Sequence, residues 1–150
     1  MPARADIYNG LEKLLLASGM RTVWRGPFFP DEQTLPGESY PVAGYVDQGS
    51  VIYDNHNYGF SIKGQIDVVL WVQTGEISGP LGGQAGWDQL DALHDAIMYE
   101  FLRSYQTYFS QTTVVVPERF TPIYGYRGAE GATVSASPAV LQVHYELNFA

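Results

Sequence analysis

The chain has 150 residues, and its 45% hydrophobic and 14% aromatic content is enough to fill one core, so we expect a single domain over residues 1–150. Sixteen acidic residues against eight basic ones give a net charge of −8, which argues against tight DNA or RNA binding, because such binding depends on Lys and Arg to neutralise phosphates. The absence of cysteine excludes disulfides, thiolate metal sites and cysteine nucleophiles, and no apolar run approaches the roughly 18 to 20 residues of a membrane span.

The first predicted element is an amphipathic helix over residues 5–18. Its apolar residues recur at helical spacing, at Ile7, Leu11, Leu14 and Leu15. Gly19 follows as a C-terminal stop. The charges at Arg4, Asp6, Glu12 and Lys13 are unlike a secretory signal, so we expect a soluble protein in the cytosol.

A loop is expected at about residues 25–41, where four prolines and several acids disfavour regular structure. Residues 40–46 then form a short β candidate, and residues 51–53 lead through a polar turn into the next strand. That turn, residues 54–57, holds Asp, Asn, His and Asn, and we favour a hairpin turn over a ligand site because turns select these residue types for backbone reasons.

The clearest pattern is a long strand over residues 60–72, in which apolar residues alternate with mostly polar ones. One face carries Phe60, Ile62, Gly64, Ile66, Val68, Leu70 and Val72. Two apolar residues, Val69 and Trp71, fall on the opposite, nominally polar face. The pattern predicts that the first face is buried and that Val69 and Trp71 face solvent.

A glycine-rich loop is expected at about residues 74–86, and a long apolar helix follows it. The apolar stripe runs through Trp87, Leu90, His94, Ile97, Phe101 and Tyr105, flanked by Leu93, Met98 and Leu102. The other side carries Asp88, Asp91, Asp95 and Glu100. The first of these acids lies near the helix N-terminus, where the macrodipole favours negative charge.

Two short β segments, residues 112–116 and 121–127, precede a Gly/Ala/Ser-rich loop at 128–137 and an alternating strand at 139–149. The predicted order is therefore α-β-β-α-β-β-β. This order indicates an α+β fold with a mixed, mainly antiparallel sheet. One N-terminal helix and one long central helix would pack on one face of it.

No motif with a catalytic mechanism occurs, so we expect no enzyme, no catalytic residue and no cofactor. Asp91, His94 and Asp95 have a spacing that could bring them around a metal ion on a helix. No second His accompanies them, and His94 lies on the apolar stripe. A solvated acidic face beside a packed histidine is the favoured interpretation, and we expect no metal site.

Two features point to association with other subunits. The apolar residues Val69 and Trp71 on a polar face, and the aromatic segment 99–109, exceed what one small core needs. The long loops at 25–41, 74–86 and 128–137 suit arms that order against neighbours. We therefore expect a homo-oligomer.

The layout resembles the tail terminator proteins of long-tailed, lambda-like bacteriophages. The resemblance rests on the N-terminal helix, the segment PVAGYV at 41–46, the strand GQIDVVLWV at 64–72, the helix led by Trp87 and Leu90, and the closing strand VLQVHYEL at 140–147. It covers most of the chain in order and spacing, with no diagnostic motif.

The resemblance implies a virion protein of the tail and neck, made in the host cytoplasm. Its subunits would form a ring, a hexamer in that family, that caps the tail tube, stops tube polymerisation and provides the surface for head-tail joining. Its partners would be other copies of itself, the tail tube protein and the head-closure or connector protein, with DNA only passing through the lumen. The acidic balance suits such a lumen.

Subunit contacts are hypotheses from the residues: Trp71 and Val69 on the long strand, Trp87 at the end of its loop, and Arg25 and Arg103 as basic positions facing an acidic neighbour. The nearest alternative is another component of tail assembly, either a head-closure or connector protein or a tail-tube subunit. An alternative from a different class is a carbohydrate-binding module, for which eleven tyrosines and three tryptophans could form a sugar platform.

Overall fold

The computed structural model describes residues 3–26, 40–56, 59–73, 84–111, 113–123 and 136–149. Within these residues the chain forms two helices and a five-stranded sheet. The elements are α1 (Arg4–Ala17), β1 (Thr22–Arg25), β2 (Val42–His56), β3 (Gly59–Gln73), α2 (Gln84–Tyr108), β4 (Val114–Pro122) and β5 (Ala136–Phe149).

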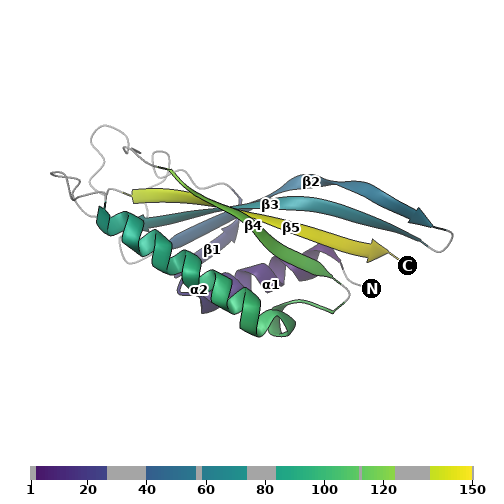
Figure 1. The fold of residues 1–150 in the computed structure, drawn as a ribbon, viewed down its shortest axis with the longest axis horizontal. Coiled ribbons are helices and arrows are strands. Elements are labelled where there is room, and N and C mark those ends of the chain that lie inside the picture. The colour runs from purple at the N-terminus through teal and green to yellow at the C-terminus, as the bar shows by residue number, and fades with distance from the viewer. Residues whose placement is uncertain are drawn as a thin grey trace.

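The strand order in the sheet is β1-β2-β3-β5-β4, so β1 and β4 are its two edges (Figure 1). The pairs β2–β3, β3–β5 and β4–β5 are antiparallel, whereas β1 runs parallel to β2. The fold is therefore α+β with a mixed, mainly antiparallel sheet, and the predicted fold class is confirmed.

Both helices pack on the same face of the sheet, as the sequence predicted (Figure 1). The apolar residues of α1 and the core stripe of α2 meet the alternating residues of β3 and β5 in one hydrophobic core. Its fully buried members include Leu11, Leu14, Ile66, Leu70, Leu90, Ile97, Leu141 and Tyr145. The opposite face of the sheet carries no helix among the described residues (Figure 1).

The hairpin of β2 and β3 extends past the ends of both helices (Figure 1). An irregularity in the pairing interrupts β2 between Asp47 and Ser50, where Gly49 has φ 102°, a left-handed conformation that favours glycine. Near the tip of the hairpin Val51, Ile52 and Phe60 are exposed. Phe60 was predicted on the buried face, but its position beyond the helices leaves it 40% exposed.

Two details of the predicted order are wrong. The strand β1 was not predicted, because a four-residue strand is too short for periodicity to detect. The two segments predicted at 112–116 and 121–127 correspond to one strand, β4, which ends at Pro122. The β candidate at 40–46 is also longer than predicted, because β2 continues through residues 51–53 to His56. The order along the chain is therefore α-β-β-β-α-β-β.

Pro117 explains why β4 looked like two segments. Its ring removes a backbone donor, which normally argues against a strand interior. Here it lies on an edge strand, and the register with β5 shifts between Pro117 and Arg119. Proline is tolerated at bulges and at sheet edges, so the strand continues through it.

The predicted loops change at their boundaries. Arg25 belongs to β1, residues 84–86 belong to α2, and β5 already begins at Ala136. Most of the three predicted loops, residues 27–39, 74–83 and 128–135, lies outside the described residues. Residues 124–127, the end of the β segment predicted at 121–127, lie outside them as well. Neither of the two described helices combines the length and the hydropathy needed to cross a membrane.

Candidate functional site

Trp71 is buried, so the prediction that it faces solvent is wrong. It does lie on the helix-free face, as the alternation required, but only 4% of it is exposed. It packs with Tyr40 and Val42 in a small second cluster, against which Trp24 and Val69 are partly buried. The neighbouring strands β1 and β2 supply this cover, since Val42 pairs directly with Trp71 and Trp24 pairs with Gly44. Trp71 therefore stabilises the subunit itself.

The remaining predicted contact residues do not form one surface. Trp87 is 37% exposed at the start of α2. Arg103 lies near the other end of α2, with its guanidinium 4.9 Å from the ring centroid of Tyr99. Arg25 lies on β1, with its guanidinium 4.5 Å from the ring centroid of Tyr8. Of the five predicted contact residues, only Val69 and Trp71 lie together in the structure.

The weak metal hypothesis finds no support among the described residues, where no group of three His, Asp or Glu side chains is placed to hold an ion. His94 stacks on Phe120 with ring centroids 4.2 Å apart and an angle of 11° between the planes. Asp91 and Asp95 are exposed on α2. This arrangement matches the favoured interpretation of an acidic face beside a packed histidine.

One polar cluster ties α1 to the sheet, and its centre is Asp47 on β2. The hydroxyls of Tyr8 and Tyr145 donate hydrogen bonds to Asp47 Oδ2 over 2.6 and 2.8 Å, and the backbone N–H of Gly49 donates to Oδ1 over 2.8 Å. Gly64 leaves room for the ring of Tyr145, because a Cβ there would lie 2.5 Å from its Cζ and hydroxyl. The carboxylate therefore cross-links α1, β2 and β5.

These hydrogen bonds set the ionisation of the cluster. Burial raises the pKa of Asp47, but the hydrogen bonds from Tyr8, Gly49 and Tyr145 outweigh it and hold the pKa below its usual value. Burial, and then the hydrogen bond to Asp47, raise the pKa of Tyr8 to about 12. Every group keeps its ordinary charge state at neutral pH, so the cluster is a structural cross-link without a group poised for proton transfer.

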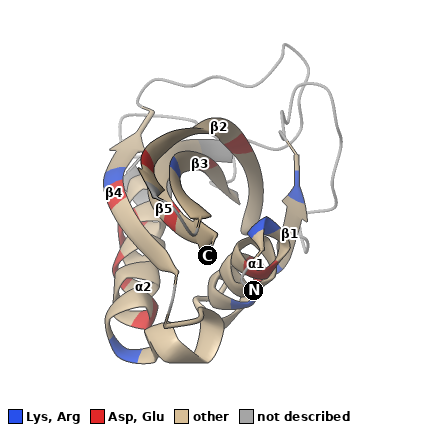
Figure 2. Cartoon of the chain, turned by 90° about the vertical axis from the view of Figure 1, so that its right-hand side faces the viewer, with Lys and Arg blue, Asp and Glu red and all other residues tan. Residues whose placement is uncertain are grey.

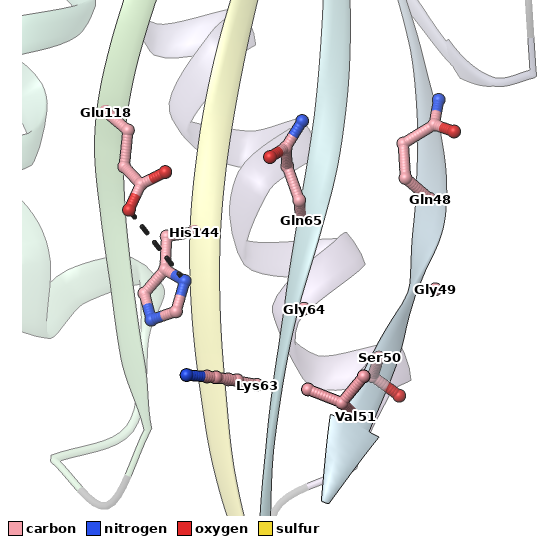
Figure 3. Close-up of a pocket in the computed structure, with 9 residues that line it drawn as sticks. All are labelled: Gln48, Gly49, Ser50, Val51, Lys63, Gly64, Gln65, Glu118 and His144. Atoms are coloured by element: carbon pink, nitrogen blue, oxygen red, sulfur yellow. Dashed lines mark ion pairs between the residues drawn. The ribbon is translucent and has the colours of Figure 1, made fainter. Parts of the chain in front are cut away.

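A shallow polar groove of about 560 Å³ crosses β2, β3, β5 and β4 on the helix-free face (Figure 3). Lys63, Gln65 and His144 project into it, and Glu118 lies at its β4 side (Figure 3). His144 Nδ1 is 3.9 Å from Glu118 Oε1, and its Nε2 is 3.3 Å from Glu146 Oε1. The groove contains no hydroxyl or thiol nucleophile paired with this histidine, so it supports polar binding better than catalysis.

An apolar groove of about 320 Å³ lies between α2 and the edge strand β4. Met98, Leu102, Tyr105 and Val116 line it. Leu102 is 85% exposed and Val116 is 45% exposed, a high exposure for aliphatic residues that lie side by side. We call this surface, made of α2, β4 and the groove between them, the α2–β4 flank.

The opposite side of the subunit is formed by α1 and β1, and we call it the α1–β1 flank. Figure 2 shows the two flanks on opposite sides of the sheet, in keeping with β1 and β4 as its two edges. The exposed acids Asp88, Asp91 and Asp95 lie on the α2–β4 flank. The exposed bases Lys13, Arg21 and Arg25 lie on the α1–β1 flank or on the turn that joins α1 to β1. In total, α2 and β4 hold five acids and two bases, whereas α1, β1 and the turn between them hold four bases and two acids. The two flanks therefore differ in the sign of their net charge.

Sequence reasoning missed the α2–β4 flank because it assigned Leu102 to the apolar side of the helix. Spacing does carry a signal, since Leu102 follows Asp88, Asp91 and Asp95 at intervals of a helical turn and so shares their exposed side. An apolar residue in line with acids was therefore detectable. That β4 lies next to it as an exposed edge follows from tertiary structure alone.

No protein-family model matches the chain, and no curated protein is similar to it in sequence.

Proposed function

We propose that this chain is a non-enzymatic structural subunit of the tail terminator type, which forms a ring on the end of a phage tail tube. The observation that carries the proposal is the pair of unlike flanks on opposite edges of one sheet, one of them with an exposed apolar groove. A ring is built from heterologous contacts, in which two different faces of each subunit meet. A subunit with two unlike, oppositely placed faces suits this assembly.

Two further features support the proposal. The predicted fold class, a mainly antiparallel sheet with two helices on one face, is the one that the resemblance to tail terminators implies. The net charge of −8 suits a lumen that lets DNA slide, because a basic channel would bind phosphates. In this role the ring would be part of the virion neck, would stop tube polymerisation, and would provide the surface on which the head-closure protein docks.

The test is electron microscopy of lysates from a phage whose copy of this gene carries a nonsense mutation. Termination predicts overlong tails of variable length. Normal-length tails that lie apart from DNA-filled heads would contradict termination and favour the alternative of a head-closure or connector protein. Absence of tubes would favour a tail-tube subunit, and intact virions would remove the tail and neck assignment altogether.

The polar groove on the helix-free face favours one alternative from another class, a carbohydrate-binding module. Amide, amino and carboxylate groups from Gln65, Lys63 and Glu118 could hydrogen-bond sugar hydroxyls there. The residues that line the groove include no Phe, Tyr or Trp side chain to stack on a sugar, and Trp71 is buried elsewhere. A glycan array, with thermal shifts of any sugar that binds, would distinguish this alternative: a specific sugar ligand would favour it.

A further inference from the structure

We infer that copies of this chain associate head to tail, with the α2–β4 flank of one subunit docked against the α1–β1 flank of the next. The inference rests on the proposed ring and names the surfaces that close it. The molecule that fills the apolar groove of the α2–β4 flank is therefore a second copy of the same chain.

The α2–β4 flank brings exposed apolar residues of a helix and a strand together. Leu102 projects from α2 beside Val116 of β4, and the groove next to them is lined almost entirely by carbon. Exposure of such a surface to water is unfavourable, and its burial against a partner would lower the free energy of the system. The exposed side of α1 offers a matching apolar residue, Leu16, which is 50% exposed.

The two flanks also carry complementary net charges. On α2, Asp88, Asp91, Asp95 and Leu102 are spaced by three, four and seven residues, so they share one exposed stripe that is acidic in its first half and apolar farther along. On α1, Lys13 and Leu16 are three residues apart and share the exposed side of that helix, with Arg21 close behind in the chain. Each flank thus combines an exposed apolar residue with charged residues. Figure 2 shows charges of both signs on each flank, but the net charges of the two flanks have opposite signs.

The two flanks end in opposite edges of one sheet. Although α1 and α2 pack against each other, the edge strands β1 and β4 are separated by three strands and cannot meet within one subunit. A contact between unlike faces on different copies leaves one of each face free, so it propagates until a ring closes. Attraction between opposite charges across the contact would fix which face meets which, since like flanks would repel.

The experiment uses two full-length variants, each with one flank blocked: Leu102→Glu on the α2–β4 flank and Leu16→Glu on the α1–β1 flank. Both side chains are at least half exposed, so the substitutions leave the core intact. Ile52→Glu is the matched control, because Ile52 is 64% exposed on the β2–β3 hairpin, outside both flanks. Native mass spectrometry and sedimentation equilibrium report the oligomeric state.

We expect the wild type and Ile52→Glu to form closed oligomers. Each blocked variant alone should associate about tenfold or more weakly, because the new carboxylate would have to lose its water in an apolar contact without a partner. A one-to-one mixture of the blocked variants should give a heterodimer and nothing larger, because only one intact pair of flanks remains. The double exchange Asp91→Lys with Lys13→Glu in one chain should restore part of the association that either single exchange weakens.

Several results would overturn the inference. These are a wild type that stays monomeric at its highest soluble concentration, a Leu102→Glu variant that still forms the ring, an Ile52→Glu control that loses it, or a mixture that fails to dimerise. Circular dichroism of each variant separates loss of assembly from loss of fold. Because the assay needs no phage, it can fail while the lysates still show overlong tails, and then only the choice of flanks is wrong. If the isolated protein forms rings through these flanks but the nonsense mutant makes tails of normal length, the proposed function is contradicted instead.

Discussion

Trp71 and Leu102 are large apolar residues that both lie outside the main core, but only Trp71 is covered by other residues of the chain. Trp71 lies on the helix-free face, where Tyr40, Val42 and Trp24 pack around it. Leu102 lies on α2, the helix that also supplies Leu90 and Ile97 to the core, yet it is 85% exposed. The sequence pattern predicted the reverse, with Trp71 exposed and Leu102 on the apolar side of the helix.

Periodicity assigns a residue to one face of a strand or helix, but it does not say whether other residues cover that face. Trp71 is covered because Tyr40 and Val42 pack with it, and because β1, a strand too short for its pattern to be detected, brings Trp24 against this cluster. Leu102 stays exposed because β4 is an edge strand, beside which no further described element packs. An apolar residue that its own chain leaves exposed is the better indication of a partner.

The largest loss of stability is expected in the cluster around Trp71. Trp71→Ala should lower the free energy of unfolding by about 3–5 kcal/mol, because it removes a buried indole and leaves a cavity among Tyr40, Val42 and Trp24. Urea denaturation measures the change. Trp87→Ala, which alters a tryptophan that is 37% exposed, is the control and should cost far less. Equal losses would mean that Trp71 has no special role in stability.

Gly64→Ala should lower the free energy of unfolding by about 2–3 kcal/mol, the second largest loss. The added methyl group would lie 2.5 Å from the hydroxyl of Tyr145 and 2.6 Å from the carbonyl oxygen of Gly49, so the Asp47 cluster would have to open. Gly49→Ala separates crowding from backbone strain, because Gly49 has φ 102° and open space around its Cβ position. We expect that control to cost about 1 kcal/mol in a thermal melt. A larger loss for Gly49→Ala than for Gly64→Ala would contradict the close packing.

The third prediction concerns Asp47 and pH. Its pKa is lower in the folded chain than in the unfolded chain, so its contribution to stability is present above the unfolded pKa and is lost as pH falls through the folded pKa. At neutral pH Asp47→Asn should cost about 2 kcal/mol, the usual value of hydrogen bonds to a charged group. Unfolding free energies measured from neutral to acidic pH should converge for the two proteins. A constant difference across that range would exclude the carboxylate as the cause.

The smallest effect on stability is expected at Leu102. Leu102→Ala should change the unfolding free energy by less than about 0.5 kcal/mol, because 85% of the residue is already in water. Differential scanning calorimetry at a dilution that keeps the chain monomeric measures it. The same variant should weaken association, whereas Trp71→Ala should weaken folding. A loss above about 2 kcal/mol in the Leu102→Ala monomer would place the residue in the core and reverse the comparison.

Much of the fold was predictable from sequence because it follows local periodicity. The alternation of β3 and β5 gave their buried faces, and the helical spacing gave the buried side of α1. The strand order, the cover over Trp71 and the exposure of β4 depend on which strands become neighbours, and periodicity contains no such information. Of the predicted contact residues, Val69 and Trp71 are now assigned to a cluster within the subunit. On the α2–β4 flank, the alignment of Leu102 with the acids of α2 could be found from spacing, but its place beside the exposed edge strand β4 follows only from tertiary structure.

The most direct test of the account is the length of phage tails when the nonsense mutant is complemented with plasmid-borne variants of this protein. We predict uniform tails of normal length with the wild type and with Ile52→Glu, and overlong tails of variable length with Leu102→Glu, which should fold but fail to close the ring. Tails of normal length in the presence of Leu102→Glu, or in the absence of any copy of the protein, would contradict the account.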